Sequence, residues 1–326
     1  MHTLKRLMVG LDPTAEDQPA LRRAAWLAGK TGASVELFLC YYNEYLSGNR
    51  LFDADSLRSA RQEVLSGMES YVEKLAQPLR EQGLEAGSVV VWHHPLHDAV
   101  VRHAEAIGAD IVFKDTHHHG ALSRAFFTHS DWALIRACPT LLWLVRPGEM
   151  PAEPVLLAAL DPFHQHDKPA ALDDEILRVG RALADAGNGR LHAFHAYDPR
   201  IAVATATANA YIPVSLPLDQ IEKEMHAQHE KRFAEITEFH GLDPQRTHLA
   251  AGLTHEELPA AATELAASVV IMGAVARNRL KRMFIGATAE RTLEHLPCDL
   301  LIVRPSWDRQ PAATEEREAE SSTATA

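Results

Sequence analysis

"LKRLMVGLDPT", residues 4–14, is repeated in altered form as "EPVLLAALDPF", residues 153–163. Each stretch is a short apolar run that ends in Asp-Pro, and Asp12 and Asp161 are 149 positions apart (161 − 12). An apolar run of this length before a turn dipeptide predicts a buried strand that ends at the aspartate. The chain therefore contains two copies of one opening unit.

Later segments repeat with a different spacing. "ADIVFKDT" (109–116) matches "ASVVIMGA" (267–274), and "CPTLLWLVRPG" (138–148) matches "LPCDLLIVRPS" (296–306). Both pairs are 158 positions apart, so the second copy gained nine residues (158 − 149) between its first and fourth strands. The uncharged stretch 201–218 lies in that interval, and we expect the extra residues there, lining an apolar pocket or packing between the copies. Several matching segments in register indicate a tandem duplication.

Strand-length apolar runs alternate with longer amphipathic segments within the first copy. The apolar runs are 7–11, 35–41, 88–92, 111–114 and 141–145. The first two helices are predicted to stop at Gly32 and Gly83, and Pro78 should disturb the last turns of the second. This alternation predicts parallel strands joined by right-handed crossovers. We therefore predict an α/β fold of two tandem doubly wound domains, each a five-stranded parallel sheet with helices on both faces.

The predicted domains are 1–148 and 149–306, followed by a disordered acidic tail, 307–326. The last strands, 141–145 and 300–303, are the predicted pairing edges, because an unpaired edge favours aggregation. Pairing there would make a pseudo-twofold dimer within one chain. Further self-association of the whole chain stays open.

Composition excludes several classes of function. The 326 residues carry a formal net charge of −12, which argues against a broad nucleic-acid surface. No run of about 18 apolar residues is present, so no membrane span is predicted. Cys40, Cys138 and Cys298 form no CxxC pair, as expected of thiols in a reducing compartment. We predict a cytoplasmic protein.

The order and spacing of these segments resemble the universal stress protein family. The likeness extends over residues 4–305 and is carried by "VWHHPLHDAVV", "THHHG", "HSDWALIRACP" and "FIGATAERTLEHLPCDLLIVRP". The resemblance implies a stress-response protein whose loop after the fourth strand binds ATP, a related adenine nucleotide or another small phosphate-bearing ligand.

The family's nucleotide loop has the form G-x2-G-x9-G-[S/T]. In the second copy Gly273 and Gly286 fill the first and third positions, Ala276 and Ala287 fill the second and fourth, and Thr288 follows. Glycine lets the backbone approach phosphate, and the N–H groups at the start of the next helix attract anions. The implied ligand contacts further include Asp161, Met272 and Arg277. The basic run around Arg277 is equally typical of a solvated surface.

The first copy departs from this pattern. Asp115 stands at the position of Gly273, His118 faces Ala276, and Thr128 stands at the position of Gly286. A carboxylate where phosphate would approach is repulsive in a partly dry site. We therefore predict that only the second copy binds a nucleotide. Asp12 and Asp161 follow the first strand of each copy, where the resemblance implies a carboxylate against the base or ribose of the ligand. Asp-Pro is also a common start of a turn, so we assign Asp161 to ligand contact and Asp12 to turn formation.

Histidines gather in the first copy, at 93, 94, 97, 117–119 and 129. His117 and His119 are candidate zinc ligands, with Asp115 or Asp131 adding a carboxylate. Solvent-exposed or hydrogen-bonded imidazoles are the alternative, and no HExxH or CxxC spacing supports a known metal motif. His226 and His229, three apart on a predicted helix, share a face and form a second candidate.

The sequence contains no nucleophile motif and no paired carboxylates at a defined spacing, so no catalytic residue is assigned. Slow hydrolysis of bound ATP stays open, without a residue to name as its base. Two other functions remain: a carrier or sensor of an amphipathic ligand, whose tail lies under 201–218, and a zinc-binding module in the first copy.

Overall fold

The protein is described from a computed structural model, which places residues 4–47, 54–116, 127–163, 171–200, 218–274 and 287–305. The first half contains β1 (Arg6–Gly10), α1 (Pro19–Thr31), β2 (Ser34–Tyr41), α2 (Ala54–Glu81), β3 (Ala86–Trp92), α3 (Leu96–Ile107), β4 (Ile111–Asp115), α4 (His129–Ala137) and β5 (Leu141–Val145). The second half contains β6 (Val155–Ala159), α5 (Ala171–Gly187), β7 (Arg190–Tyr197), α7 (Leu218–Phe239), η1 (Pro244–Arg246), β8 (Thr247–Ala251), α8 (Thr254–Glu264), β9 (Val269–Gly273), α9 (Ala287–His295) and β10 (Asp299–Val303).

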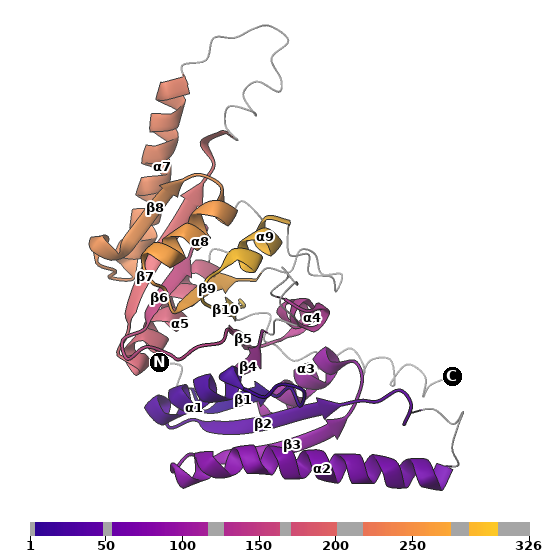
Figure 1. Ribbon diagram of the computed structural model, residues 1–326. Helices are drawn as coiled ribbons and strands as arrows, with labels where there is room; N and C mark the ends of the chain where they lie inside the picture. The colour runs from indigo at the N-terminus through magenta and orange to yellow at the C-terminus, as the bar shows by residue number, and fades with distance from the viewer. Residues whose placement is uncertain are drawn as a thin grey trace, which may run out of the picture.

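The strands form one sheet in the order β3-β2-β1-β4-β5-β10-β9-β6-β7-β8 (Figure 1). All pairs within each half are parallel. The halves meet at β5 and β10, which pair antiparallel with Trp143 opposite Leu301. The predicted fold class and the pseudo-twofold packing of the halves are confirmed.

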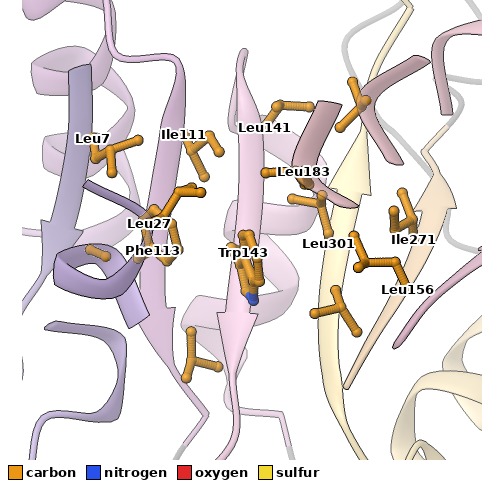
Figure 2. Close-up of a cluster of buried hydrophobic side chains, with 14 of the residues drawn as sticks. Leu7, Leu27, Ile111, Phe113, Leu141, Trp143, Leu156, Leu183, Ile271 and Leu301 are labelled. Atoms are coloured by element: carbon orange, nitrogen blue, oxygen red, sulfur yellow. The ribbon is translucent and has the colours of Figure 1, made fainter. Parts of the chain in front are cut away.

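Helices cover both faces of the sheet. On one face α1, α2, α5 and α7 pack on a hydrophobic cluster that runs through both halves. On the other, α3, α4, α8 and α9 pack on a second cluster. Figure 2 shows the first cluster crossing the junction, with Phe113 and Trp143 on one side of it and Leu301 and Ile271 on the other. The halves therefore share their cores.

Two glycines stop helices as predicted, but the proline prediction is wrong. Gly32 caps α1 in the left-handed region at φ 73°, and its N–H donates to the carbonyl oxygen of Ala28. Gly83, at φ 84°, follows α2. However, α2 continues through Pro78 to Glu81. Pro78 lies on the exposed face of the helix, where water can satisfy the carbonyl group that proline leaves without a donor.

The strand register shows where the second half gained residues. Arg6 pairs with Ser34, and Val155 pairs with Arg190. The offset is therefore 149 (155 − 6) at the first strand and already 156 (190 − 34) at the second. Seven of the nine extra residues thus lie between β6 and β7. Most of the insertion therefore lies outside 201–218, and the expectation that this stretch holds it is wrong. Matching the two sequences did not locate the second pair of strands, so it could not place the insertion. Residues 201–217 lie outside the described ranges.

A buried polar network joins the halves beside β5 and β10. The Asp299 carboxylate accepts hydrogen bonds from Arg23 Nε at 2.7 Å, Trp143 Nε1 at 2.9 Å and the Arg146 backbone N–H at 3.0 Å. All three donors belong to the first half. Leu141 occupies the equivalent position in the first half (299 − 158), so the network exists on one side of the pseudo-twofold axis only.

A second pair of contacts across the junction is made by equivalent arginines, Arg146 and Arg304, which are 158 positions apart. Arg146 follows β5 and donates from Nη1 to the carbonyl oxygen of Leu296, just past α9, at 2.9 Å. Arg304 follows β10 and donates from Nη2 to the carbonyl oxygen of Ile135, in α4, at 2.9 Å. Each half thus satisfies a carbonyl group at the end of the other half's last helix, where such groups lack helical partners.

Among the helices placed by the structure, none combines the length and the apolar character that crossing a membrane requires.

Candidate functional site

The carboxyl ends of β6 and β9 lie side by side in the second half. Ala158 pairs with Ile271, so Asp161, just after β6, lies next to the end of β9 at Gly273. Helix α9 begins at Ala287, after the loop that follows β9. Ligands of open parallel sheets bind at this edge, and the N-terminus of a helix there attracts anions.

Gly273 is required by close packing. A Cβ atom at this position would lie 2.6 Å from Leu172 Cδ2 and 3.2 Å from Ile176 Cδ1, both in α5. Its φ does not lie in the left-handed region, so the backbone conformation itself does not demand glycine. The sequence pattern identified an important glycine, and the structure adds a reason that a phosphate motif does not contain.

Asp161 and Asp12 occupy matching turns but have different surroundings. Asp12 Oδ1 accepts from the Thr14 backbone N–H at 2.8 Å and from its hydroxyl at 2.6 Å, which is the predicted turn role. In the second half Phe163 stands at the position of Thr14. The Asp161 carboxylate has no hydrogen-bond partner among the described residues, and its backbone N–H donates to Asp173 Oδ1 at 3.2 Å. Asp161 is thus available for another group.

Most of the predicted loop cannot be placed. Ala276, Arg277 and Gly286 lie outside the described residues, and Ala287 and Thr288 are described only as the backbone that begins α9. Met272 is half-buried and packs against the second hydrophobic cluster, which lies between the sheet and helices α8 and α9. Side chains alternate along a strand, so Met272 points to one face of the sheet and Gly273 lies against the other. The structure therefore brings Asp161 and Gly273 together and begins α9 after the loop that follows β9, and it leaves the other predicted contacts as predictions.

In the first half, Asp115 occupies the position of Gly273. Its side chain is 2% exposed, and Oδ1 accepts from the Ala20 N–H, at the start of α1, at 2.6 Å. Its other oxygen has no partner among the described residues. Burial raises the pKa of Asp115 to about 7. At neutral pH the Asp115 side chain is thus partly uncharged. It excludes an anion from this position mainly because the side chain fills the space, and less because of charge repulsion.

A second carboxylate of the first half fills the N-terminus of α4. Asp131 is fully buried, and its Oδ2 accepts from the Thr128 backbone N–H at 2.7 Å in a capping box. Lys114 Nζ, also largely buried, lies 2.7 Å from Asp131 Oδ1. Ala289 stands at the position of Asp131 in the second half (131 + 158). The first half therefore carries its own anion where the second half has a small apolar residue.

A group of rings, which we call the imidazole cluster, lies beside Asp161 and was only partly foreseen. It consists of Phe163, His195, Tyr197, His226 and His229. His195 Nε2 lies 2.8 Å from His229 Nδ1, and the Tyr197 hydroxyl lies 2.8 Å from His226 Nδ1. The spacing of His226 and His229 predicted their shared helix face. Nothing in the sequence indicated that α7 would lay them on His195 and Tyr197, because those residues belong to β7.

His229 of this cluster is held uncharged at neutral pH. Burial lowers the pKa of His229 to about 4, and the neighbouring His195 lowers it further, while Asp161 acts in the opposite direction. Tyr197 stacks on His229 with ring centroids 4.3 Å apart, and Phe163 lies 4.2 Å away. The arrangement is a packed aromatic wall at the ends of β6 and β7.

The comparison with known families identifies the fold's relatives. The sequence model described as the universal stress protein family matches residues 3–146 and 166–304. The chain belongs to the universal stress protein family.

Close relatives span the whole chain. Universal stress protein E of Escherichia coli (strain K12) is 30% identical over 324 residues, which cover 98% of this chain and 99% of the relative. The universal stress protein E homolog of Haemophilus influenzae is 28% identical over 314 residues, 93% of this chain and 98% of the relative. This chain is therefore similar to tandem members of the family along its full length.

Solved structures agree on the fold. A functionally unknown protein of Pseudomonas aeruginosa PAO1 matches with a TM-score of 0.72 and 22% identity, over 97% of this chain and 98% of its own. Two further universal stress proteins, one in complex with cAMP and one from Archaeoglobus fulgidus in complex with dAMP, match 44% and 35% of this chain with TM-scores of 0.34 and 0.24. The two nucleotides were observed bound to those two proteins.

The metal candidates of this universal stress protein are not brought together in the described parts of the chain. His117 and His119 lie outside those ranges. Within the ranges, no three His, Cys, Asp or Glu side chains converge as metal ligands would. His226 and His229 instead take part in the ring contacts of the imidazole cluster.

Proposed function

We propose that the second half of this universal stress protein, residues 149–306, binds an adenine nucleotide or another small phosphate-bearing ligand in the cytoplasm. The phosphate would lie at the N-terminus of α9, and Asp161 would contact the far end of the ligand. Membership of the family supports a nucleotide, and the contrast between the halves supports the location.

That contrast is the observation on which the proposal rests. In the first half Asp131 occupies the start of α4, and Asp115 occupies the space beside α1. In the second half Ala289 and Gly273 stand at those positions, so neither protein carboxylate is present. The first N–H groups of a helix carry a partial positive charge and need acceptors. An anionic ligand would supply at α9 what Asp131 supplies at α4.

Calorimetry with AMP and ATP tests the proposal on the full chain. Ala287→Asp places a carboxylate at the first residue of α9, where it favours the helix but competes with phosphate. We expect this variant, and Gly286→Asp, to lose at least about tenfold in affinity, since each adds a charge at the phosphate position. The matched control is His129→Asp at the first residue of α4, which is exposed.

The control should bind as the unaltered chain does, and circular dichroism should show all variants folded. Equal affinity in every variant, or equal losses in both halves, would refute the location. Mass spectrometry of the purified protein adds an independent result. A co-purified nucleotide would support the proposal, whereas a lipid-like species would favour the amphipathic carrier.

A further inference from the structure

The imidazole cluster lies where α7 begins to pack on the sheet. None of residues 219–228 in α7 is buried, and His229, at 6% exposure, is the first residue after them that is. Figure 1 shows this outer part of α7 projecting away from the sheet. Further along the helix, Phe233 and Thr237 are also buried. Within residues 219–239, His229 is therefore the outermost buried contact of α7.

Hydrogen bonds of histidines join α7 to β7 at this place. His229 Nδ1 lies 2.8 Å from Nε2 of His195, and His226 Nδ1 lies 2.8 Å from the Tyr197 hydroxyl. His195 Nδ1 lies 3.2 Å from the carbonyl oxygen of Leu160, which only accepts, so this nitrogen carries the hydrogen. In the neutral ring, Nε2 of His195 then accepts from His229 Nδ1. The contact between the two rings thus requires an uncharged His195.

Added protons would disturb this contact in two ways. A charged His229 would be buried between Tyr197 and Phe163, whose rings lie at centroid distances of 4.3 and 4.2 Å, and burial of a charge is unfavourable. A charged His195 would have a hydrogen on Nε2, facing the hydrogen on His229 Nδ1. His229 can regain water only by leaving the sheet, and α7 must move with it.

The groups around His229 compensate a positive charge poorly. Burial lowers its pKa from the ordinary 6.5 to about 4, and His195 and His226 act in the same direction, whereas Asp161, in the turn after β6, acts against them. Burial also raises the pKa of Tyr197 above its ordinary 10, so the hydroxyl stays neutral in acid. His229 therefore takes up a proton more readily when α7 is released than when it is packed.

The first half makes the equivalent contact without an imidazole. The offset of 156 between the second strands places Leu39 at the position of His195 (195 − 156). The glycines that follow α2 and α7 are 158 positions apart (241 − 83), so Tyr71 in α2 stands at the position of His229 (229 − 158). Leu39 and Tyr71 both pack in the first hydrophobic cluster. Neither of them gains a proton in acid.

We infer that the imidazole cluster is an acid-sensitive switch, which holds the outer part of α7 on the sheet at neutral pH and releases it when the buried histidines gain protons. The equivalent helix of the first half, α2, stays in place. Release uncovers the rings of Phe163 and Tyr197 at the ends of β6 and β7. The switch is separate from the proposed function, because it requires no bound nucleotide.

Amide hydrogen exchange of the full chain, corrected for the intrinsic effect of pH on exchange, tests the inference. A group whose pKa is lower in the packed state favours release as the pH falls from 6.5 towards 4. The shift of His229 thus predicts that the protection of residues 219–233 falls at least about tenfold between pH 7 and pH 4.5. The protection of residues 61–75, the matching part of α2, should not change.

A double variant carries the residue types of the first half into the second. His195→Leu combined with His229→Tyr should leave the protection of α7 equal at the two pH values. The matched control is His192→Gln. The pKa of His192 is likewise lowered to about 4, but its ring pairs with His248 at 2.9 Å on the opposite face of the sheet from His195. This control should lose protection as the unaltered chain does.

Circular dichroism at pH 7 should show that the variants are folded. If the double variant does not fold, His229→Phe takes its place, since it keeps a ring between Tyr197 and Phe163 and should reduce the acid response. An acid response equal to that of the unaltered chain, simultaneous loss of protection in α2 and α7, or no loss down to pH 4 would overturn the inference. Nucleotide affinity at pH 7 is a separate measurement, so either proposal can fail without the other.

Discussion

Arg23 and Asp299, which are 276 residues apart, form an ion pair of 2.7 Å that links the two halves of the protein. Their side chains are 7% and 3% exposed, so solvent screens the pair very little. Burial raises the pKa of Asp299, although Arg23, Trp143 and the Arg146 N–H all favour its charged form. The three donors thus stabilise the charged carboxylate, but burying that charge is itself unfavourable.

Removing one partner of this pair should destabilise the whole chain. Arg23→Met leaves the Asp299 carboxylate buried with fewer donors, and we expect the free energy of unfolding to fall by about 3 kcal/mol or more. Urea unfolding followed by circular dichroism measures this. Arg22→Met is the control, since Arg22 pairs with Asp17 at the surface and such pairs contribute about 0–1 kcal/mol. Similar losses in the two variants would show that the buried pair has no special role.

Asp115 should make stability depend on pH. Its pKa is raised from 3.8 to about 7 by burial, so between these values the folded chain holds a proton that the unfolded chain has released. Stability therefore falls as pH rises through this window, by about 2–4 kcal/mol for this group. Asp115→Asn keeps an acceptor for Ala20 without the charge. The difference in unfolding free energy between the variant and the unaltered chain should grow in favour of the variant from pH 4.5 to pH 8, and a constant difference would contradict the assignment.

Gly273 should tolerate no side chain. Gly273→Ala brings a methyl group into Leu172, and we expect a loss of about 1–3 kcal/mol in unfolding free energy. Gly29→Ala is the matched control, because nothing lies within 4 Å of that position in the exposed part of α1. It should stabilise the chain by about 0.5–1 kcal/mol, since alanine favours a helix over glycine. Partial rescue of Gly273→Ala by Leu172→Ala would identify the contact, and no change in Gly273→Ala would disprove it.

The arginine contacts across the junction should contribute more to stability than the ion pairs of surface arginines. Arg304→Met removes a buried donor from the Ile135 carbonyl group, and we expect about 1–3 kcal/mol of destabilisation. Arg232→Met, which removes a pair with Glu235 that is exposed on both sides, should change stability by less than about 1 kcal/mol. Thermal or urea unfolding distinguishes these outcomes, and equal effects would argue against a role for the contact across the junction.

The sequence predicted the fold because its signals are local and repeated. The run 141–145 forms β5 with the expected bounds, and Gly32 ends α1 as its position after the helical pattern requires. The prediction that Pro78 disturbs the end of α2 is wrong because the effect of a proline depends on which face of the helix meets water. The residue type alone does not show which face that is.

The candidate site was harder to predict because it depends on contacts between distant elements. Comparing the halves located Asp115 and Gly273, since each occupies a matching position. No such comparison could reveal that Leu172 packs on Gly273, or that His229 lies on His195. Those contacts depend on how α5 and α7 cross the sheet, and the sequence pattern fixes only which face of a helix is apolar.

The one-sided Arg23–Asp299 pair has a consequence for how such a protein evolves. In a homodimer every substitution appears twice, so a carboxylate buried at one subunit's edge strand would require a matching set of donors from each subunit. In the fused chain Leu141 stands at the position equivalent to Asp299, so one carboxylate and one set of donors suffice. Linkage in one gene therefore opens asymmetric solutions that identical subunits could not reach.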